Sequence, residues 1–264
     1  MSANIRPIFV LGSPRSGTTL LGNYIGSSKE ILDLGEYFGF AFTYFKLPEM
    51  FATVPSKIKH EYLDSLKKHS VDFAYKITEQ SNLKFYCDST PWNILIADVL
   101  VDILPNALFI LVIRNYKGVI QSLERSYNDG YKWAGKNLEE RAQLYSDCYS
   151  RVEHLPLDRT IVVNYDQLCS QPEFTLLKLK DKLNNFGIDS NLFDETIFLH
   201  SHATNPKHKR DVLAIKKDDK IIFRPIPSYN KSLWDAHIDQ KVYPIVKGSI
   251  EKITNKFPNE YLFV

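Results

Sequence analysis

The stretch IFVLGSPRSGTTLL, from Ile8 to Leu21, constrains the fold more than any other part of the chain. It begins as an apolar run typical of a buried strand, passes through a loop bounded by Gly12 and Gly17, and continues as an apolar helical pattern. The glycines permit backbone angles at which successive N–H groups turn toward one anion, and the following helix adds its positive end. The stretch therefore predicts a loop that binds a phosphate or a sulfate.

The spacing of the two glycines matches the nucleoside triphosphate loop GxxxxGK[ST], but Thr18 stands where that motif has lysine. The only cation in the loop is Arg15. A triphosphate needs the lysine for its β and γ charges, so the sequence favours a smaller anionic group held without metal. A P-loop kinase is a weaker alternative, also because the apolar run at 107–113 ends in Arg114 and not in the aspartate that binds Mg²⁺.

The string PRSGTT, from Pro14 to Thr19, resembles the loop of sulfotransferases that use 3′-phosphoadenosine 5′-phosphosulfate (PAPS), and is closest to that of the Golgi-type, tyrosylprotein and bacterial members. The resemblance implies a P-loop nucleotide-hydrolase-like sulfotransferase fold. It also implies that Arg15 contacts the bridging and sulfuryl oxygens of PAPS. The residues that would hold its 5′-phosphate are Ser16, Gly17, Thr18 and Thr19.

Apolar runs at 8–11, 84–87, 107–113 and 160–164 alternate with helical patterns along the chain. This alternation predicts an α/β fold with a central, mostly parallel sheet flanked by helices. No linker or internal repeat interrupts the 264 residues, so we expect residues 1–264 to form a single domain.

Two later motifs complete the predicted nucleotide site. Arg114 leaves the carboxyl end of a predicted strand, where ligands bind in open α/β sheets, and Ser122 follows two helical turns later. The segment RNYKGVIQS resembles the family pattern RDPRDVxxS, which implies that Arg114 and Ser122 bind the 3′-phosphate. Tyr165 begins the string YDQL, which resembles YEDL of sulfotransferases, so we assign it to the adenosine side; a core tyrosine is the alternative.

The general base has two candidates. Glu36 follows the loop helix in the string DLGE, and a Gly-Glu at this position supplies the base in tyrosylprotein and several other Golgi-type sulfotransferases. We therefore assign the base to Glu36, with a solvent-exposed turn glutamate as the alternative. Asp88 is the reserve base, because the string DSTP has Ser89 where many carbohydrate sulfotransferases have a catalytic lysine, and no KxH string is present.

Two further regions have open interpretations. The aromatic residues at 40–45 line either the core or a substrate pocket. The basic stretch at 202–231 is either a solvated face or a late loop that closes over the nucleotide, as in sulfotransferases.

Composition excludes several classes of function. A net charge of +2 is too small to indicate nucleic acid or a membrane surface as a partner. The three cysteines have no CxxC spacing and the histidines have no metal-ligand spacing, so we predict neither a disulfide framework nor a metal site. No segment approaches a membrane-spanning length, and we expect a cytoplasmic protein.

These features together predict transfer of a sulfuryl group from PAPS to a hydroxyl of a small specialised metabolite, with release of PAP and without a metal. A carbohydrate is the second candidate acceptor, and tyrosine of a peptide is the third. A non-catalytic binder of sulfated or phosphorylated ligands is a further alternative, because Ser89 stands where many carbohydrate sulfotransferases have the catalytic lysine.

Overall fold

The structure, a computed structural model, describes residues 5–46, 55–200 and 212–260. Its centre is a five-stranded sheet in the order β2-β3-β1-β4-β5, in which every neighbouring pair is parallel. The strands are β1 (Arg6–Leu11), β2 (Ile31–Asp33), β3 (Phe85–Asp88), β4 (Leu108–Ile113) and β5 (Thr160–Asn164). The predicted α/β fold with a parallel sheet is confirmed, and β2 is a strand that the apolar pattern does not predict.

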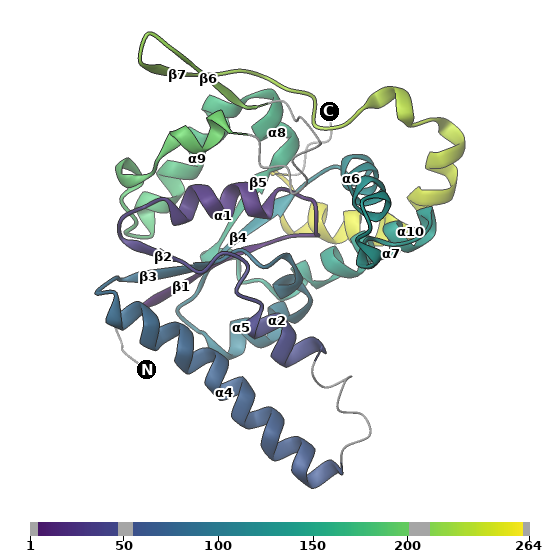
Figure 1. Ribbon diagram of the computed structural model, residues 1–264. Helices are drawn as coiled ribbons and strands as arrows, with labels where there is room; N and C mark the ends of the chain where they lie inside the picture. Colours follow the sequence, from purple (N-terminus) through teal and green to yellow (C-terminus); the bar gives the residue numbers. More distant parts are fainter. Residues whose placement is uncertain (1–4, 47–54, 201–211, 261–264) are drawn as a thin grey trace.

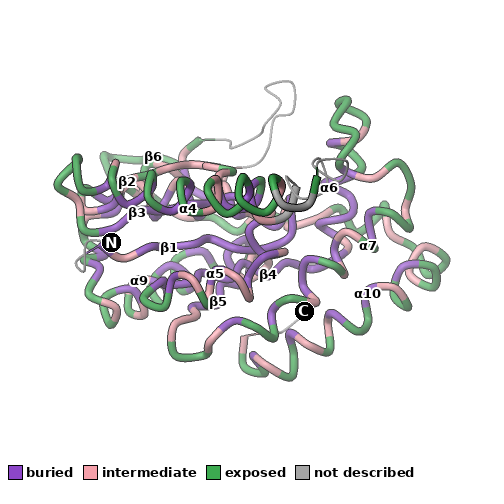
Figure 2. The backbone as a smooth tube through the Cα atoms, turned by 90° about the horizontal axis from the view of Figure 1, so that it is seen from below, coloured by how far each residue is buried: buried purple, intermediate pink, exposed green. Residues whose placement is uncertain are grey.

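Helices cover both faces of this sheet (Figure 1). One layer consists of α1 (Thr18–Gly26), α8 (Tyr165–Ser170) and α9 (Pro172–Asn185). The other contains α4 (Ser56–Gln80), α5 (Ala97–Ile103), α6 (Tyr116–Asn128), α7 (Leu138–Tyr149) and α10 (Ala236–Lys256). Side chains of β1 alternate between the layers, since Ile8 and Val10 pack with the first and Phe9 and Leu11 with the second. The central strands are buried along their length (Figure 2).

The sheet brings the predicted site residues to one edge. Leu11 pairs with Leu111 in the parallel register, so the loop after β1 and Arg114 after β4 leave the same carboxyl side. Ligands bind at this side in open α/β sheets.

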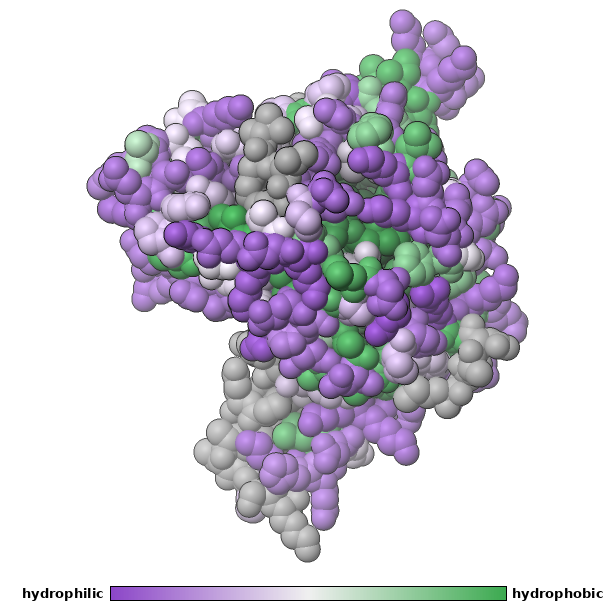
Figure 3. Space-filling view, turned by 180° about the vertical axis from the view of Figure 1, so that it is seen from behind, coloured by the Kyte–Doolittle hydropathy of each residue, from purple (hydrophilic) through white to green (hydrophobic). Residues whose placement is uncertain are grey.

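Several short elements differ from the sequence expectation. After Pro91 the chain forms a 3₁₀ turn, η2 (Pro91–Ile96), before α5 begins. An antiparallel hairpin, β6 (Ala214–Lys217) and β7 (Lys220–Phe223), lies within the basic stretch at 202–231. The basic residues of that stretch from His202 to Arg210 lie outside the described residues. On the face shown in Figure 3, hydrophobic residues form patches among hydrophilic ones.

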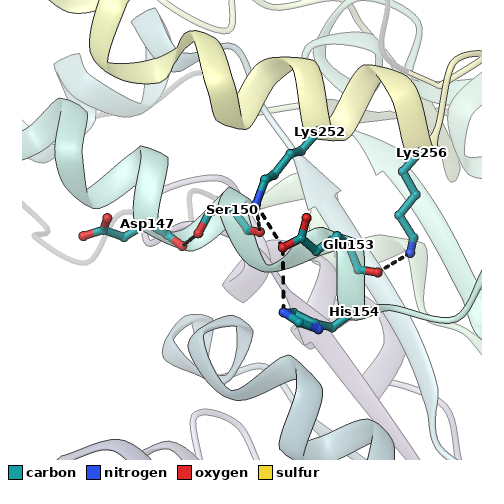
Figure 4. Close-up of polar contacts among 6 residues, drawn as sticks. All are labelled: Asp147, Ser150, Glu153, His154, Lys252 and Lys256. Carbon is teal, nitrogen blue, oxygen red and sulfur yellow. Dashed lines mark hydrogen bonds and ion pairs between the residues drawn. The ribbon is translucent and has the colours of Figure 1, made fainter.

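Helix α10 is held to the body by a polar cluster (Figure 4). It packs on α7 and on the 3₁₀ turn η4 (Ser150–His154). Lys252 Nζ donates to Ser150 O at 3.2 Å and to Glu153 Oε1 at 3.0 Å, and Lys256 Nζ donates to Glu153 O at 2.6 Å. This contact fixes the last helix on the side of the sheet that carries α7.

Candidate functional site

The loop between β1 and α1 has a backbone that only glycine permits at two positions. A β-carbon on Gly12 would lie 2.7 Å from the carbonyl oxygen of Val112, so β1 and β4 approach too closely for a side chain. Gly17 has φ of +106°, in the left-handed region that favours glycine, and Arg15 has φ of +72°. Left-handed residues separated by a right-handed one turn consecutive N–H groups to one side. The backbone of this loop is therefore compatible with the predicted binding of an anion.

Some polar groups of this loop have no hydrogen-bond partner among the described residues. Ser16 is fully buried, and its Oγ has no hydrogen-bond partner among the described residues. Helix α1 begins at Thr18 with no side-chain cap on its first turn. Uncapped N–H groups and the helix dipole favour an anion at this position.

Arg114 lies directly against the loop. Its Nη1 donates to the carbonyl oxygen of Arg15 at 2.8 Å, and its guanidinium lies 4.5 Å from the centre of the Tyr165 ring. The side chain is buried, and its Nε has no partner among the described residues. A β-carbon on Gly118 would lie 2.9 Å from that Nε, so the glycine makes room for the guanidinium.

Ser122 of α6 contacts the loop arginine. Arg15 Nε donates to Ser122 Oγ at 3.2 Å, which brings the loop cation to α6. Two positive charges thus converge within one site, where they match the charge of a phosphate or sulfate ligand.

Tyr165, at the start of α8, packs on the loop from the layer that contains α1. A β-carbon on Gly17 would lie 2.3 Å from the Tyr165 ring, so the ring is in direct contact with the glycine. The residue therefore lies between the loop and Arg114, at the site and not in a remote part of the core.

Glu36 reaches the loop because β2 ends in a tight turn. Gly35 has φ of +59°, its N–H donates to Asp33 Oδ1 at 2.8 Å, and its carbonyl oxygen accepts from the Ser89 N–H at 2.8 Å. Thr19 Oγ1 then donates to Glu36 Oε1 at 3.1 Å. The carboxylate is exposed to solvent beside the first turn of α1.

Asp88, the second candidate for the base, is buried and its carboxylate is occupied by hydrogen bonds within its own turn. It is fully buried, its Oδ1 accepts from the Thr90 N–H at 2.8 Å, and its Oδ2 accepts from Asn93 Nδ2 at 2.9 Å. Burial raises the pKa of Asp88, and these hydrogen bonds oppose the shift. The carboxylate orders the turn after β3, so Glu36 has the better access to an acceptor.

Ser89 is packed too tightly to leave space for a cation. A β-carbon on Gly22 of α1 would lie 2.3 Å from Ser89 Cβ, and Ser89 Oγ donates to the carbonyl oxygen of Gly35 at 3.2 Å. The two arginines are therefore the cations that the described residues place at the loop.

A segment at 228–230 contacts the site residues, and it lies inside the basic stretch 202–231 for which a closing loop is one of the two interpretations. Arg114 Nη2 donates to the carbonyl oxygen of Ser228. Gln121 Nε2 donates to Asn230 O at 2.8 Å, and the Asn230 N–H donates to Gln121 Oε1 at 3.0 Å. The sequence indicates this stretch through its basic composition, but no local pattern pairs Gln121 with Asn230, which lie 109 positions apart.

The described residues contain no group of three or more His, Cys, Asp or Glu side chains arranged to hold a metal. Within the described ranges, no helix is both long enough and apolar enough to cross a membrane.

Comparison with known proteins finds sulfotransferases, both by a family model and among solved structures. A family model described as "Sulfotransferase family" matches residues 7–185. A search of curated protein sequences finds no match. Solved structures that resemble this one include a sulfotransferase domain from the curacin biosynthetic pathway, with 18% identity, a TM-score of 0.51 and coverage of 74% of this chain and 77% of that one.

Two other solved structures resemble the chain over a longer range. A sulfotransferase from Alicyclobacillus acidocaldarius has 11% identity and a TM-score of 0.52, with 97% of each chain covered. A sulfotransferase from Mycobacterium avium has 11% identity and a TM-score of 0.58, with 95% of this chain and 77% of that one covered. At these identities the structural likeness supports the fold.

Proposed function

Because this chain belongs to the sulfotransferase family, we propose that it transfers a sulfuryl group from PAPS to a hydroxyl of a small-molecule acceptor and releases PAP. The observation that carries the proposal is the convergence of Arg15, Arg114 and the unpartnered Ser16 Oγ on one glycine-bounded loop. A buried hydroxyl and a buried guanidinium N–H without partners are costly unless a ligand accepts from them.

The nucleotide would be held at both of its charged ends. The 5′-phosphosulfate binds to the loop, where Ser16, Gly17, Thr18 and Thr19 surround the phosphate and Arg15 reaches the sulfuryl group. The 3′-phosphate binds to Arg114 and Ser122, and Tyr165 contacts the adenosine side. The two arginines supply the positive charge that lysine and Mg²⁺ supply in triphosphate sites, so we expect binding without metal.

The transfer step breaks the S–O bond to the 5′-phosphate and forms an S–O bond to the acceptor oxygen. The acceptor hydroxyl loses its proton to Glu36, and the electron pair of the broken bond remains on the phosphate of PAP. Arg15 stabilises the negative charge that grows on the bridging oxygen. We further propose that residues 1–264 act as a single domain in this reaction.

Isothermal titration with PAP tests the nucleotide assignment. We expect saturable binding that is unchanged when EDTA replaces Mg²⁺. Binding of ATP with Mg²⁺ in preference to PAP would instead indicate a kinase.

Turnover is tested with ³⁵S-labelled PAPS and a panel of small alcohols, sugars and tyrosyl peptides. Labelled product with an alcohol supports the proposal. Tight PAP binding without transfer to any class of acceptor would indicate the non-catalytic binder, and labelled sugar or peptide would replace the proposed acceptor class.

A further inference from the structure

An aromatic pair, Trp92 and Trp133, consists of residues that the mechanism above does not use. Trp92 belongs to η2, and Trp133 belongs to the 3₁₀ turn η3 (Lys132–Ala134). Their ring centroids are 5.7 Å apart with planes at 81°, and the Tyr131 ring lies 6.2 Å from Trp133. Trp133 is 44% exposed and Tyr131 42% exposed. Large apolar rings therefore remain at the surface in one group.

The backbone keeps these rings at the surface. Ala134 is fully buried, the Tyr131 N–H donates to Ser126 O at 3.0 Å, and Arg141 Nε donates to Gly135 O at 3.1 Å. The loop is thus tied to α6 at one end and to α7 at the other. Folding gains little from an exposed indole, so its presentation on a fixed loop suits a ligand-binding role.

A hydrogen bond joins the turn before Trp92 to the segment that follows Glu36. Thr90 Oγ1 accepts from the Phe38 N–H at 3.1 Å. Trp92 follows Thr90 by two residues, and Glu36 precedes Phe38 by two residues, so both belong to adjoining turns. Phe38 is itself 43% exposed with φ of +57°, a backbone angle that a bulky residue rarely adopts.

Building on the proposed sulfuryl transfer, we infer that Trp92 and Trp133 form the acceptor-binding surface, and that the acceptor is an alcohol whose hydroxyl-bearing carbon is attached to a planar aromatic ring system. Aromatic rings gain affinity in edge-to-face and offset-stacked pairs beyond the area they bury. A sugar would need several acceptors and donors to replace the water around its hydroxyls, whereas an indole offers one donor and no acceptor.

The test compares naphthalen-2-ylmethanol with its decahydro analogue. Both are primary alcohols on the same carbon skeleton, and they differ in the aromaticity and planarity of the ring system. Titration of each alcohol into the PAP-saturated protein measures acceptor binding without turnover. We expect the wild-type protein to bind the aromatic alcohol more tightly.

The variant Trp133→Leu keeps apolar bulk and removes the ring. We expect it to weaken binding of the aromatic alcohol by about three- to tenfold and to leave that of the decahydro analogue within about twofold. Trp133→Phe should retain most of the preference. Phe174→Leu, which removes a 52% exposed ring from α9, is the matched control and should change neither affinity. PAP affinity should be the same in all four proteins.

Equal affinity of the wild-type protein for the two alcohols would overturn the inference, and so would an unchanged preference in Trp133→Leu. If the preference depends on Trp133 but labelled PAPS yields no sulfated product, the ring-binding surface is supported and the proposed transfer reaction fails. If Trp133→Leu raises the KM for the aromatic alcohol relative to the decahydro analogue and leaves kcat unchanged, the result supports both the ring-binding surface and the transfer reaction.

Discussion

Two polar clusters of this chain are built in opposite ways. At the contact between α10 and η4, Lys252, Lys256 and Glu153 lie in a group whose charged atoms have hydrogen-bond partners (Figure 4). At the glycine-bounded loop, buried Ser16 and Arg114 have polar atoms without partners among the described residues. The first cluster holds a helix in place, and the second has capacity for a ligand.

The two clusters differ in how their polar groups contribute to the free energy of folding. An exposed ion pair contributes little to stability, and removing it leaves water in its place. A buried polar atom without a partner costs free energy in the folded state, on the order of 1–3 kcal/mol for a neutral group. Two of the six such side-chain atoms in the described ranges, Ser16 Oγ and Arg114 Nε, are donors at or beside the glycine-bounded loop. An anionic ligand that accepted from them would relieve this cost.

The largest effect is expected for Glu36→Gln. The amide keeps the shape and can still accept from Thr19, but it cannot take a proton, so kcat should fall at least about a hundredfold while PAP affinity stays the same. The measurement is steady-state turnover of PAPS together with PAP titration. Glu139→Gln, an exposed glutamate in the first turn of α7, is the matched control.

Near-normal turnover of Glu36→Gln would move the base to Asp88 if Asp88→Asn were folded and inactive. A thermal unfolding curve for Asp88→Asn is needed in that case, because its carboxylate also orders the turn at Thr90 and Asn93.

Arg114→Ala should have the next largest effect, on binding. The variant loses a charge-assisted contact to the 3′-phosphate, and PAP affinity should fall about ten- to a hundredfold. Affinity for the nucleotide without the 3′-phosphate should change much less. A variant that discriminates between the two nucleotides as well as the wild-type protein does would show that Arg114 is not the 3′-phosphate anchor.

Ser16→Ala should have a smaller effect, with opposite consequences for the stability of the fold and for PAP affinity. The hydroxyl has no partner among the described residues of the ligand-free fold, so its removal should leave the free energy of unfolding unchanged or raise it. PAP affinity should fall by roughly two- to tenfold, because the 5′-phosphate loses a donor. Denaturant unfolding and PAP titration measure the two signs separately. A loss of stability with unchanged affinity would mean that Ser16 belongs with the structural cluster.

Lys252→Met should have the smallest effect. The partners it leaves are accessible to water, so the denaturant midpoint should shift slightly and PAP affinity should not change. The hydrogen bond from Lys252 holds the pKa of Glu153 below its ordinary value of 4.5. The pair therefore stabilises the fold above about pH 4.5 and loses that contribution as the pH falls through the lowered pKa. Equal stability differences between variant and wild type at pH 7 and pH 3 would contradict this account.

The sequence predicts the parts of the molecule that local patterns encode. The loop follows from its two glycines, the strand β4 from an unbroken apolar run, and Arg114 from its position at the end of that strand. The chain has no comparable local signal for β2, since three residues between two turns show no periodicity.

Partners that meet only in the folded chain escape sequence reasoning. The Gln121 and Asn230 hydrogen bonds and the contact of Ser89 with Gly22 join residues whose proximity depends on the whole topology. The sequence shows that a lysine is absent at position 89, but only the structure shows that α1 fills the space beside it.

The packing of Tyr165 on Gly17 has a consequence for how this chain can vary. The ring occupies the space of a β-carbon, and the glycine also has a backbone angle that other residues avoid. A side chain at position 17 would thus need both a smaller residue at 165 and a different loop conformation. A replacement of Gly17 alone would therefore damage the loop, so we expect homologous sequences to change position 17 only where position 165 is smaller. The first strand-loop-helix unit and the segment after β5 should then vary together at these two positions, although they lie far apart in the sequence.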